Sequence, residues 1–141
     1  EIYTLSLHDA LPISSLLLVV IALLAMLIGL VGPALMKQLD SSKTKIAKLQ
    51  IEEIAKTLDI YKLDTGRYPT TAEGLAALDK KPGSVSGWNG PYMKDGVPTD
   101  PWGNPYRYAN PGPSGGLEIA SYGADNAPGG EGENADVSNG R

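Results

Sequence analysis

The sequence predicts an α+β protein in which one long N-terminal helix packs on a small antiparallel sheet. The first observation is an uncharged apolar run, residues 16–36, that passes directly into a polar segment with helical periodicity. The second is the distribution of glycine and proline, which cluster after Pro82 and separate short alternating runs typical of strands. With 141 residues, the chain is long enough for one modest globular domain beside this helix.

The apolar run, residues 16–36, has the length of a membrane-spanning helix. Such a helix rises roughly 30 Å, which matches the hydrocarbon thickness of a bilayer. A buried core helix is the weaker interpretation, because a domain this small could not surround it. A cleaved signal peptide also fits poorly, because Glu1 and Asp9 stand where basic residues are expected. We therefore expect a transmembrane helix over residues 16–36.

The helix is predicted to continue beyond the membrane over residues 37–66. Apolar residues recur there at spacings of four, three, four and three, which places them on one face of a helix. We expect the globular domain to pack on this face. Gly66 is a plausible stop, so a single helix is expected from about Ser14 to Asp64. The predicted stripe consists of Ala47, Ile51, Ile54, Leu58 and Tyr61.

Residues 67–141 are predicted to form the globular α+β domain. The segment 70–79 has the pattern of a short helix with a threonine near its start. Residues 105–110 and 117–122 alternate as strands do, and the glycine-rich segment 112–116 between them fits a hairpin loop. The chain has no phenylalanine, so its tryptophans and tyrosines are expected to build the core rather than a ligand surface.

The composition excludes several classes of function. A net charge of -4 is too mild to indicate a nucleic-acid partner, and the absence of cysteine excludes disulfides and thiolate metal sites. His8 is the only histidine, which makes a histidine-based triad or zinc site very unlikely. Paired carboxylates occur near the C-terminus, but no apolar cleft motif accompanies them. We therefore expect no enzymatic activity, and an anchored hydrolase is a weak alternative.

An acidic loop, residues 123–136, is the strongest candidate for a binding site. The sequence has no lysine or arginine between Arg107 and Arg141, and the loop is rich in glycine, asparagine and carboxylates. Calcium binds six to eight oxygen atoms from carboxylates, amides and backbone carbonyls held on a flexible chain. The loop lacks the EF-hand pattern. Composition alone therefore favours a solvated acidic tail over a calcium site.

Three long motifs identify a family. They are YKLDTGRYPTTAEGL, DPWGNPY and GADNAPGGEGENAD, in this order along the chain. Together with the apolar run, they resemble the major pseudopilins of bacterial type II secretion, whose helix is similar to that of type IV pilins. The resemblance implies a structural subunit that polymerises into a helical periplasmic filament, the pseudopilus, and promotes export of folded proteins across the outer membrane. A monomeric, membrane-anchored periplasmic calcium-binding module is the alternative.

The resemblance also implies location and partners. It places the chain in the bacterial inner membrane as a single-pass protein with its C-terminal domain in the periplasm. The implied partners are further copies of the chain, minor pseudopilins, an inner-membrane assembly platform and the prepilin peptidase, and the implied modification is methylation. The charge distribution instead predicts a cytoplasmic C-terminal domain by the positive-inside rule. Lysines follow the apolar run from Lys37 onward, and none precedes it. We give the family resemblance more weight than the charge rule.

The resemblance further implies a structural calcium ion in the acidic loop. Glu131 and Glu133 could equally face solvent. The calcium ligands that the resemblance implies are the carboxylates of Asp125 and Asp136, the amide of Asn134 and the backbone carbonyl of Tyr122.

The N-terminal residues depart from the family pattern. Family members begin with a basic leader that ends in glycine, followed by phenylalanine and, within the apolar run, a glutamate. Residues 1–15 contain no such cleavage site, and Leu16 stands where the glutamate is expected. We therefore expect residues 1–15 to be a non-native or aberrant leader. As written, the chain is not expected to be processed by the prepilin peptidase or to assemble normally.

Overall fold

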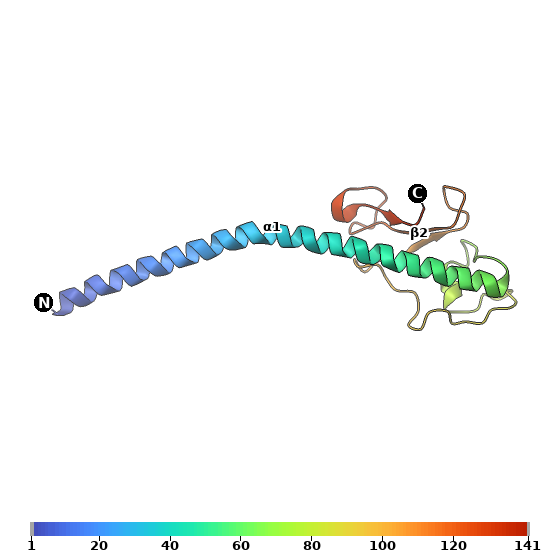
Figure 1. Ribbon diagram of the computed structural model, residues 1–141, viewed down its shortest axis with the longest axis horizontal. Helices are drawn as coiled ribbons and strands as arrows, with labels where there is room; N and C mark the ends of the chain where they lie inside the picture. Colours follow the sequence, from blue (N-terminus) through green and yellow to red (C-terminus); the bar gives the residue numbers. More distant parts are fainter. Residues whose placement is uncertain (1, 141) are drawn as a thin grey trace. The chain divides into compact units, whose positions relative to one another are not determined.

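The computed structural model describes the backbone of residues 2–140 and the side chains of residues 13–140. It divides into two compact units, Glu1–Leu39 and Asp40–Arg141, and helix α1, Ile2–Thr65, contributes to both (Figure 1). The α+β class is confirmed, because the second unit combines α1 with a three-stranded antiparallel sheet.

The first unit consists of the apolar part of α1. Its large apolar side chains from Ile13 onward are exposed, and one stretch is long and apolar enough to cross a membrane. This is consistent with membrane anchoring. The helix begins at Ile2 and not near Ser14, and it continues through Pro12. The non-native origin of residues 1–15 stays a prediction, and the side chains of residues 1–12 lie outside the described part.

In the second unit, α1 buries one stripe of side chains. All five predicted residues, Ala47, Ile51, Ile54, Leu58 and Tyr61, are at most 2% exposed. The helix ends at Thr65, where Gly66 takes a left-handed conformation (φ 84°) and donates its N–H to the carbonyl of Lys62. The periodicity of the sequence therefore predicted the buried face, and Gly66 predicted the end of α1 to within about one residue.

Three short strands lie beside α1 (Figure 1) and share the burial of this stripe with η1 and the turn-rich segment. They are β1, Arg107–Ala109, β2, Glu118–Ser121, and β3, Val137–Ser138, in the order β1-β2-β3. The pairs Tyr108↔Ile119 and Ser121↔Val137 lie on one face, and three of these residues are fully or nearly buried. The predicted strands are confirmed over shorter ranges, whereas β3 was not predicted, because two residues show no periodicity.

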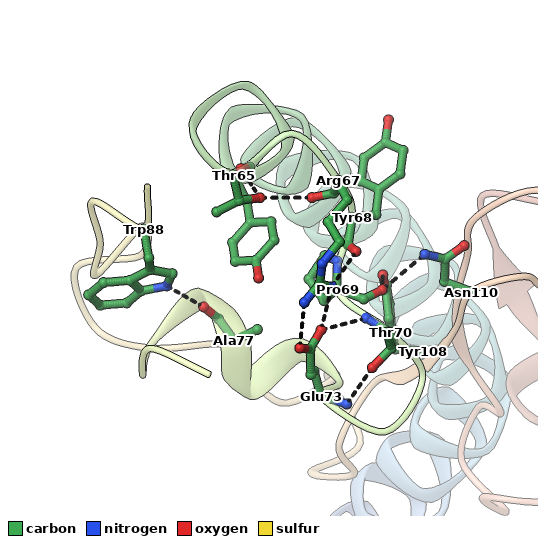
Figure 2. Close-up of polar contacts among 11 residues, drawn as sticks. Thr65, Arg67, Tyr68, Pro69, Thr70, Glu73, Ala77, Trp88, Tyr108 and Asn110 are labelled. Carbon is green, nitrogen blue, oxygen red and sulfur yellow. Dashed lines mark hydrogen bonds and ion pairs between the residues drawn. The ribbon is translucent and has the colours of Figure 1, made fainter. Parts of the chain in front are cut away.

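The predicted helix at 70–79 was wrong as an α-helix. Only the 3-10 helix η1, Leu75–Leu78, forms there. Gly74 has φ 61° and ψ -166°, which is incompatible with continuing an α-helix from the preceding turn. The capping pattern is nevertheless present, because Thr70 N–H donates to Glu73 Oε2 (2.8 Å) and Glu73 N–H donates to Thr70 Oγ1 (3.2 Å) (Figure 2).

Glu73 also joins the end of α1 to this turn. The Arg67 guanidinium donates to both oxygens of the Glu73 carboxylate, at 2.8 and 2.7 Å (Figure 2). These bonds, followed by the backbone N–H of Thr70, lower the pKa of Glu73 to about 2. The ionised carboxylate therefore stabilises the fold, and the ion pair is partly exposed to solvent.

The aromatic residues contribute to the core, as predicted. Tyr61 and Tyr106 are buried, and both tryptophans pack against the core. Their polar atoms are mostly paired: Trp88 Nε1 donates to the carbonyl of Ala77 (2.8 Å), and the Tyr108 hydroxyl donates to the carbonyl of Pro69 (2.7 Å) (Figure 2). These bonds tie the segment around Trp88 to η1 and the segment around Pro69 to β1.

Glu73→Gln tests the lowered pKa. A carboxyl whose pKa is lower in the folded state contributes stability above its unfolded pKa, near 4.5, and loses it as the pH falls toward 2. We therefore expect the free energy of unfolding of the full chain in detergent to fall between pH 4.5 and 2, and Glu73→Gln to remove about 1 kcal/mol of that fall. Urea unfolding at a series of pH values measures it. The exposed Glu52→Gln is the control, and equal pH slopes in both variants contradict the assignment.

Candidate functional site

The acidic loop connects two neighbouring strands of the sheet. It leaves β2 after Ser121 and enters β3 at Val137, and these two residues are paired. The pairing therefore brings Tyr122, the residue just before the loop, and Asp136, the last residue of the loop, to the same end of the sheet. Two of the predicted ligands are in this way positioned by the strands.

The two limbs of the loop are in direct backbone contact. Ala124 N–H donates to the carbonyl of Glu133 (2.9 Å), near the 3-10 helix η2, Gly132–Asn134. Gly123 has φ 72°, and a Cβ atom at this residue would lie 2.5 Å from the Glu133 carbonyl oxygen. Glycine is therefore required at this position both by its conformation and by the approach of the other limb.

Both predicted carboxylate ligands accept backbone hydrogen bonds within the loop. Asp125 Oδ1 accepts from Ala127 N–H (3.2 Å), and Asp136 Oδ2 accepts from Gly129 N–H (2.9 Å). Among the hydrogen bonds of the described residues, neither aspartate uses its second oxygen. Both side chains are exposed, so the free oxygens are accessible to a ligand from solvent.

The other two predicted ligands, Tyr122 and Asn134, differ in which oxygen atoms they could supply to a metal ion. The Tyr122 ring lies under the Arg107 guanidinium, 4.3 Å from the ring centroid. Its aromatic side chain is held in a cation–π contact, which leaves the backbone carbonyl as the group that Tyr122 can contribute to the loop. Asn134 is exposed and lies against Gly130, where a Cβ atom would be 2.6 Å from the Asn134 carbonyl oxygen.

The charge of the loop suits a cation bound by mixed oxygen ligands. Residues 123–136 contain four carboxylates and no lysine or arginine. Among the side chains of residues 13–140, no group of three or more His, Cys, Asp or Glu is placed to hold a metal ion. Carboxylates alone therefore do not form a site here. The donor set fits a hard cation such as calcium only when amide and carbonyl oxygens take part.

Sequence reasoning missed the surroundings of Glu133. The carboxyl of Asp40 on α1 lies beside it and raises the pKa of Glu133, and desolvation adds to the rise. Lys43 and the indole N–H of Trp102 act in the opposite direction. Glu133 is half-buried and occupied by this contact with α1, so it is a poorer ligand candidate than Asp125 or Asp136. No local pattern signals a contact between residues so far apart in sequence.

Comparison with known proteins identifies the family. The family model described as type II secretion system, protein G, matches residues 34–140. The chain belongs to this family. It is 44% identical over 130 residues to the type II secretion system core protein G of Pseudomonas aeruginosa, an alignment that covers 87% of this chain and 89% of that protein. It is 40% identical to the core protein G of Vibrio cholerae, with 86% of this chain and 85% of that protein covered.

A solved structure of the family agrees with the fold. The crystal structure of the major pseudopilin from the type 2 secretion system of enterohaemorrhagic Escherichia coli superposes with a TM-score of 0.59 at 37% sequence identity. The match covers 74% of this chain and 88% of that chain. The resemblance to major pseudopilins is therefore confirmed. This pseudopilin-family chain is a structural component of a secretion system and not an enzyme, and its membership implies assembly with other components of that system.

Two neighbouring glycines test the tight fold of the loop. Gly129 and Gly130 both have positive φ, 80° and 105°, so alanine is strained at either position by about 1 kcal/mol. A Cβ atom meets nothing within 4 Å at Gly129 but lies 2.6 Å from the Asn134 oxygen at Gly130. We therefore expect Gly130→Ala to lower the free energy of unfolding by roughly a further 1 kcal/mol and to speed hydrogen exchange at Ala124. Equal losses in the two variants contradict the described loop.

Proposed function

We propose that the chain polymerises through α1 into a periplasmic pseudopilus that promotes export of folded proteins across the outer membrane. The decisive observation is a second apolar face on α1, opposite the buried stripe. Ile46, Leu49, Ile60 and Leu63 are 47 to 83% exposed although they lie beside a folded domain. An uncovered apolar face of this kind indicates a partner that is not part of the monomer.

The spacing of this exposed face supports packing against another helix. With Glu53 and Lys56, which lie in its centre, the apolar residues follow one another at intervals of three, four, three, four and three. This period of three and a half residues is the one by which helices pack side by side along their length. A second copy of α1 offers the same face and is therefore the partner that fits best.

The two central charges favour an offset between copies. Subunits inserted into one membrane in the same direction have parallel helices. In register, Glu53 would face Glu53 and Lys56 would face Lys56, which is repulsive. An axial offset of three residues, about 4.5 Å, instead places Glu53 beside Lys56 of the next copy. Repetition of one offset produces an open filament and not a closed dimer.

The proposal includes a location and further partners, which family membership and the apolar part of α1 support. The apolar stretch is of membrane-spanning length and unburied, which supports single-pass anchoring in the bacterial inner membrane. We place residues 67–141 and the polar part of α1 in the periplasm, where a filament can form. Minor pseudopilins, an inner-membrane assembly platform and the prepilin peptidase are the further partners that this function needs.

We also propose that the acidic loop binds a structural calcium ion. Asp125 and Asp136 would supply carboxylate oxygens, with the amide of Asn134 and the backbone carbonyl of Tyr122 completing part of the set. The ion would offset the repulsion among the loop carboxylates and hold together a segment that has no apolar core. The support for this proposal is the donor chemistry and the close packing of the two limbs.

The alternative is a monomeric, membrane-anchored calcium-binding module. It needs the same loop and the same anchor, but it gives no role to the exposed face of α1. A crosslinking experiment on that face separates the two functions, because the chain has no cysteine of its own.

Paired cysteines on α1 test polymerisation. Residues 16–141 are placed behind the leader and first residues of a family member and expressed with the secretion system. We expect Leu49→Cys combined with Ile60→Cys to give a ladder of multimers with a thiol-reactive crosslinker, because each subunit has a neighbour on both sides. The control pair, Lys48→Cys with Asp59→Cys, has the same spacing on another exposed side of α1 and should give few products. Monomers from both pairs support the monomeric module.

A thermal and chemical unfolding series tests the calcium site. A ligand that binds only the folded state at about 100 times its dissociation constant raises the free energy of unfolding by about 2.7 kcal/mol. We expect calcium to stabilise the full chain in detergent to this extent and Asp125→Ala to abolish the effect. The exposed Asp95→Ala is the control and should retain it. An unchanged calcium response in Asp125→Ala excludes the proposed ligand set.

A further inference from the structure

A buried carboxylate lies beneath the start of the acidic loop. Asp100 is 4% exposed and is not within salt-bridge distance of any lysine or arginine among the described residues. Its Oδ1 accepts the backbone N–H groups of Trp102 (3.1 Å) and Asn104 (2.8 Å). Its Oδ2 accepts the hydroxyl of Ser121 (2.6 Å). A buried carboxylate held by neutral donors alone is costly unless each bond is well made, so its position is tightly constrained.

Ser121 links the buried Asp100 carboxylate to the loop through two hydrogen bonds of its hydroxyl group. Its side chain is fully buried, and its Oγ accepts the N–H of Gly123 at 3.2 Å. Because the hydroxyl proton is committed to Asp100, a lone pair of the same oxygen is directed to Gly123. The path of bonds therefore runs from the turn at residues 99–105, through Asp100 and Ser121, to Gly123, the first residue of the loop.

The position of Gly123 is the most tightly restricted one at the start of the loop. Its positive φ turns the chain, and the opposite limb lies too close for any side chain there. The residue before it, Tyr122, offers the backbone carbonyl, and Asp125 follows two residues later. A shift of Gly123 would therefore displace two of the proposed calcium ligands at once.

We propose that Asp100 and Ser121 are positioning residues that preorganise the Tyr122–Asp125 segment for a calcium ion without touching the ion. This inference rests on the proposed calcium site. It accounts for a buried carboxylate that otherwise has no role in the filament or in the apolar core. A preformed limb lowers the conformational entropy that binding has to overcome, and affinity increases accordingly.

Calcium affinity separates positioning from plain stabilisation. Titration calorimetry on the full chain in detergent measures the dissociation constant of each folded variant at a temperature well below its melting temperature. We expect Ser121→Ala to raise the dissociation constant about tenfold, the effect of losing one well-placed hydrogen bond. Ser138→Ala, a serine of the neighbouring strand outside this path, is the matched control and should bind like the parent chain.

A second variant keeps the test valid if Ser121→Ala does not fold. Asp100→Asn retains an acceptor for Trp102 and Asn104 but presents an amide to Ser121, so it should also weaken calcium binding. Faster hydrogen exchange at Gly123 and Ala124 in chelator is expected in both variants. Parent-like dissociation constants with a lowered melting temperature overturn the inference, because the residues then only stabilise the fold. A parent chain that binds no calcium refutes the proposed site itself, which is a different outcome.

Discussion

Burial of one stripe of α1 is the interaction on which the rest of the structure depends. The second unit contains only nine strand residues in its sheet, too few to enclose a core of their own. The helix supplies much of the core, and Ile54 and Leu58 are fully buried in the same apolar cluster as the sheet residue Ile119. Each burial of this kind contributes roughly 2 kcal/mol. The same contact fixes which side of α1 remains exposed to a partner.

The acidic loop has little apolar support of its own. Val137 is buried, but the loop residues from Ala124 to Asp136 are exposed or half-buried and hold together by backbone hydrogen bonds. The loop carries four carboxylates and no lysine or arginine, so the mutual repulsion of these charges opposes this arrangement. Packing and electrostatics therefore act in opposite directions at this loop, which is the condition under which a cation has most effect.

The sequence predicted the features that repeat along the chain and missed those made by single distant contacts. The stripe of α1 has a period, so Ala47 to Tyr61 could be assigned without a structure. The segment at 70–79 has a helical pattern as well, but one glycine with positive φ, Gly74, prevents an α-helix. The link from Asp100 to Ser121 spans 21 residues and leaves no local signal. The calcium ligands were inferred from family resemblance, because acidic loops without a bound ion have the same composition.

The two limbs of the loop are tied to the rest of the domain to different degrees. The first limb is tied to the core through Ser121 and Asp100, so its conformation is set before anything binds. The second limb, from Gly129 to Asp136, is held by hydrogen bonds within the loop: Gly129 N–H to Asp136, Ala124 N–H to Glu133 and the turn of η2. An ion between the limbs would therefore order the second against the first rather than fold the domain. Loss of the ion should loosen the loop while the contact between α1 and the sheet persists.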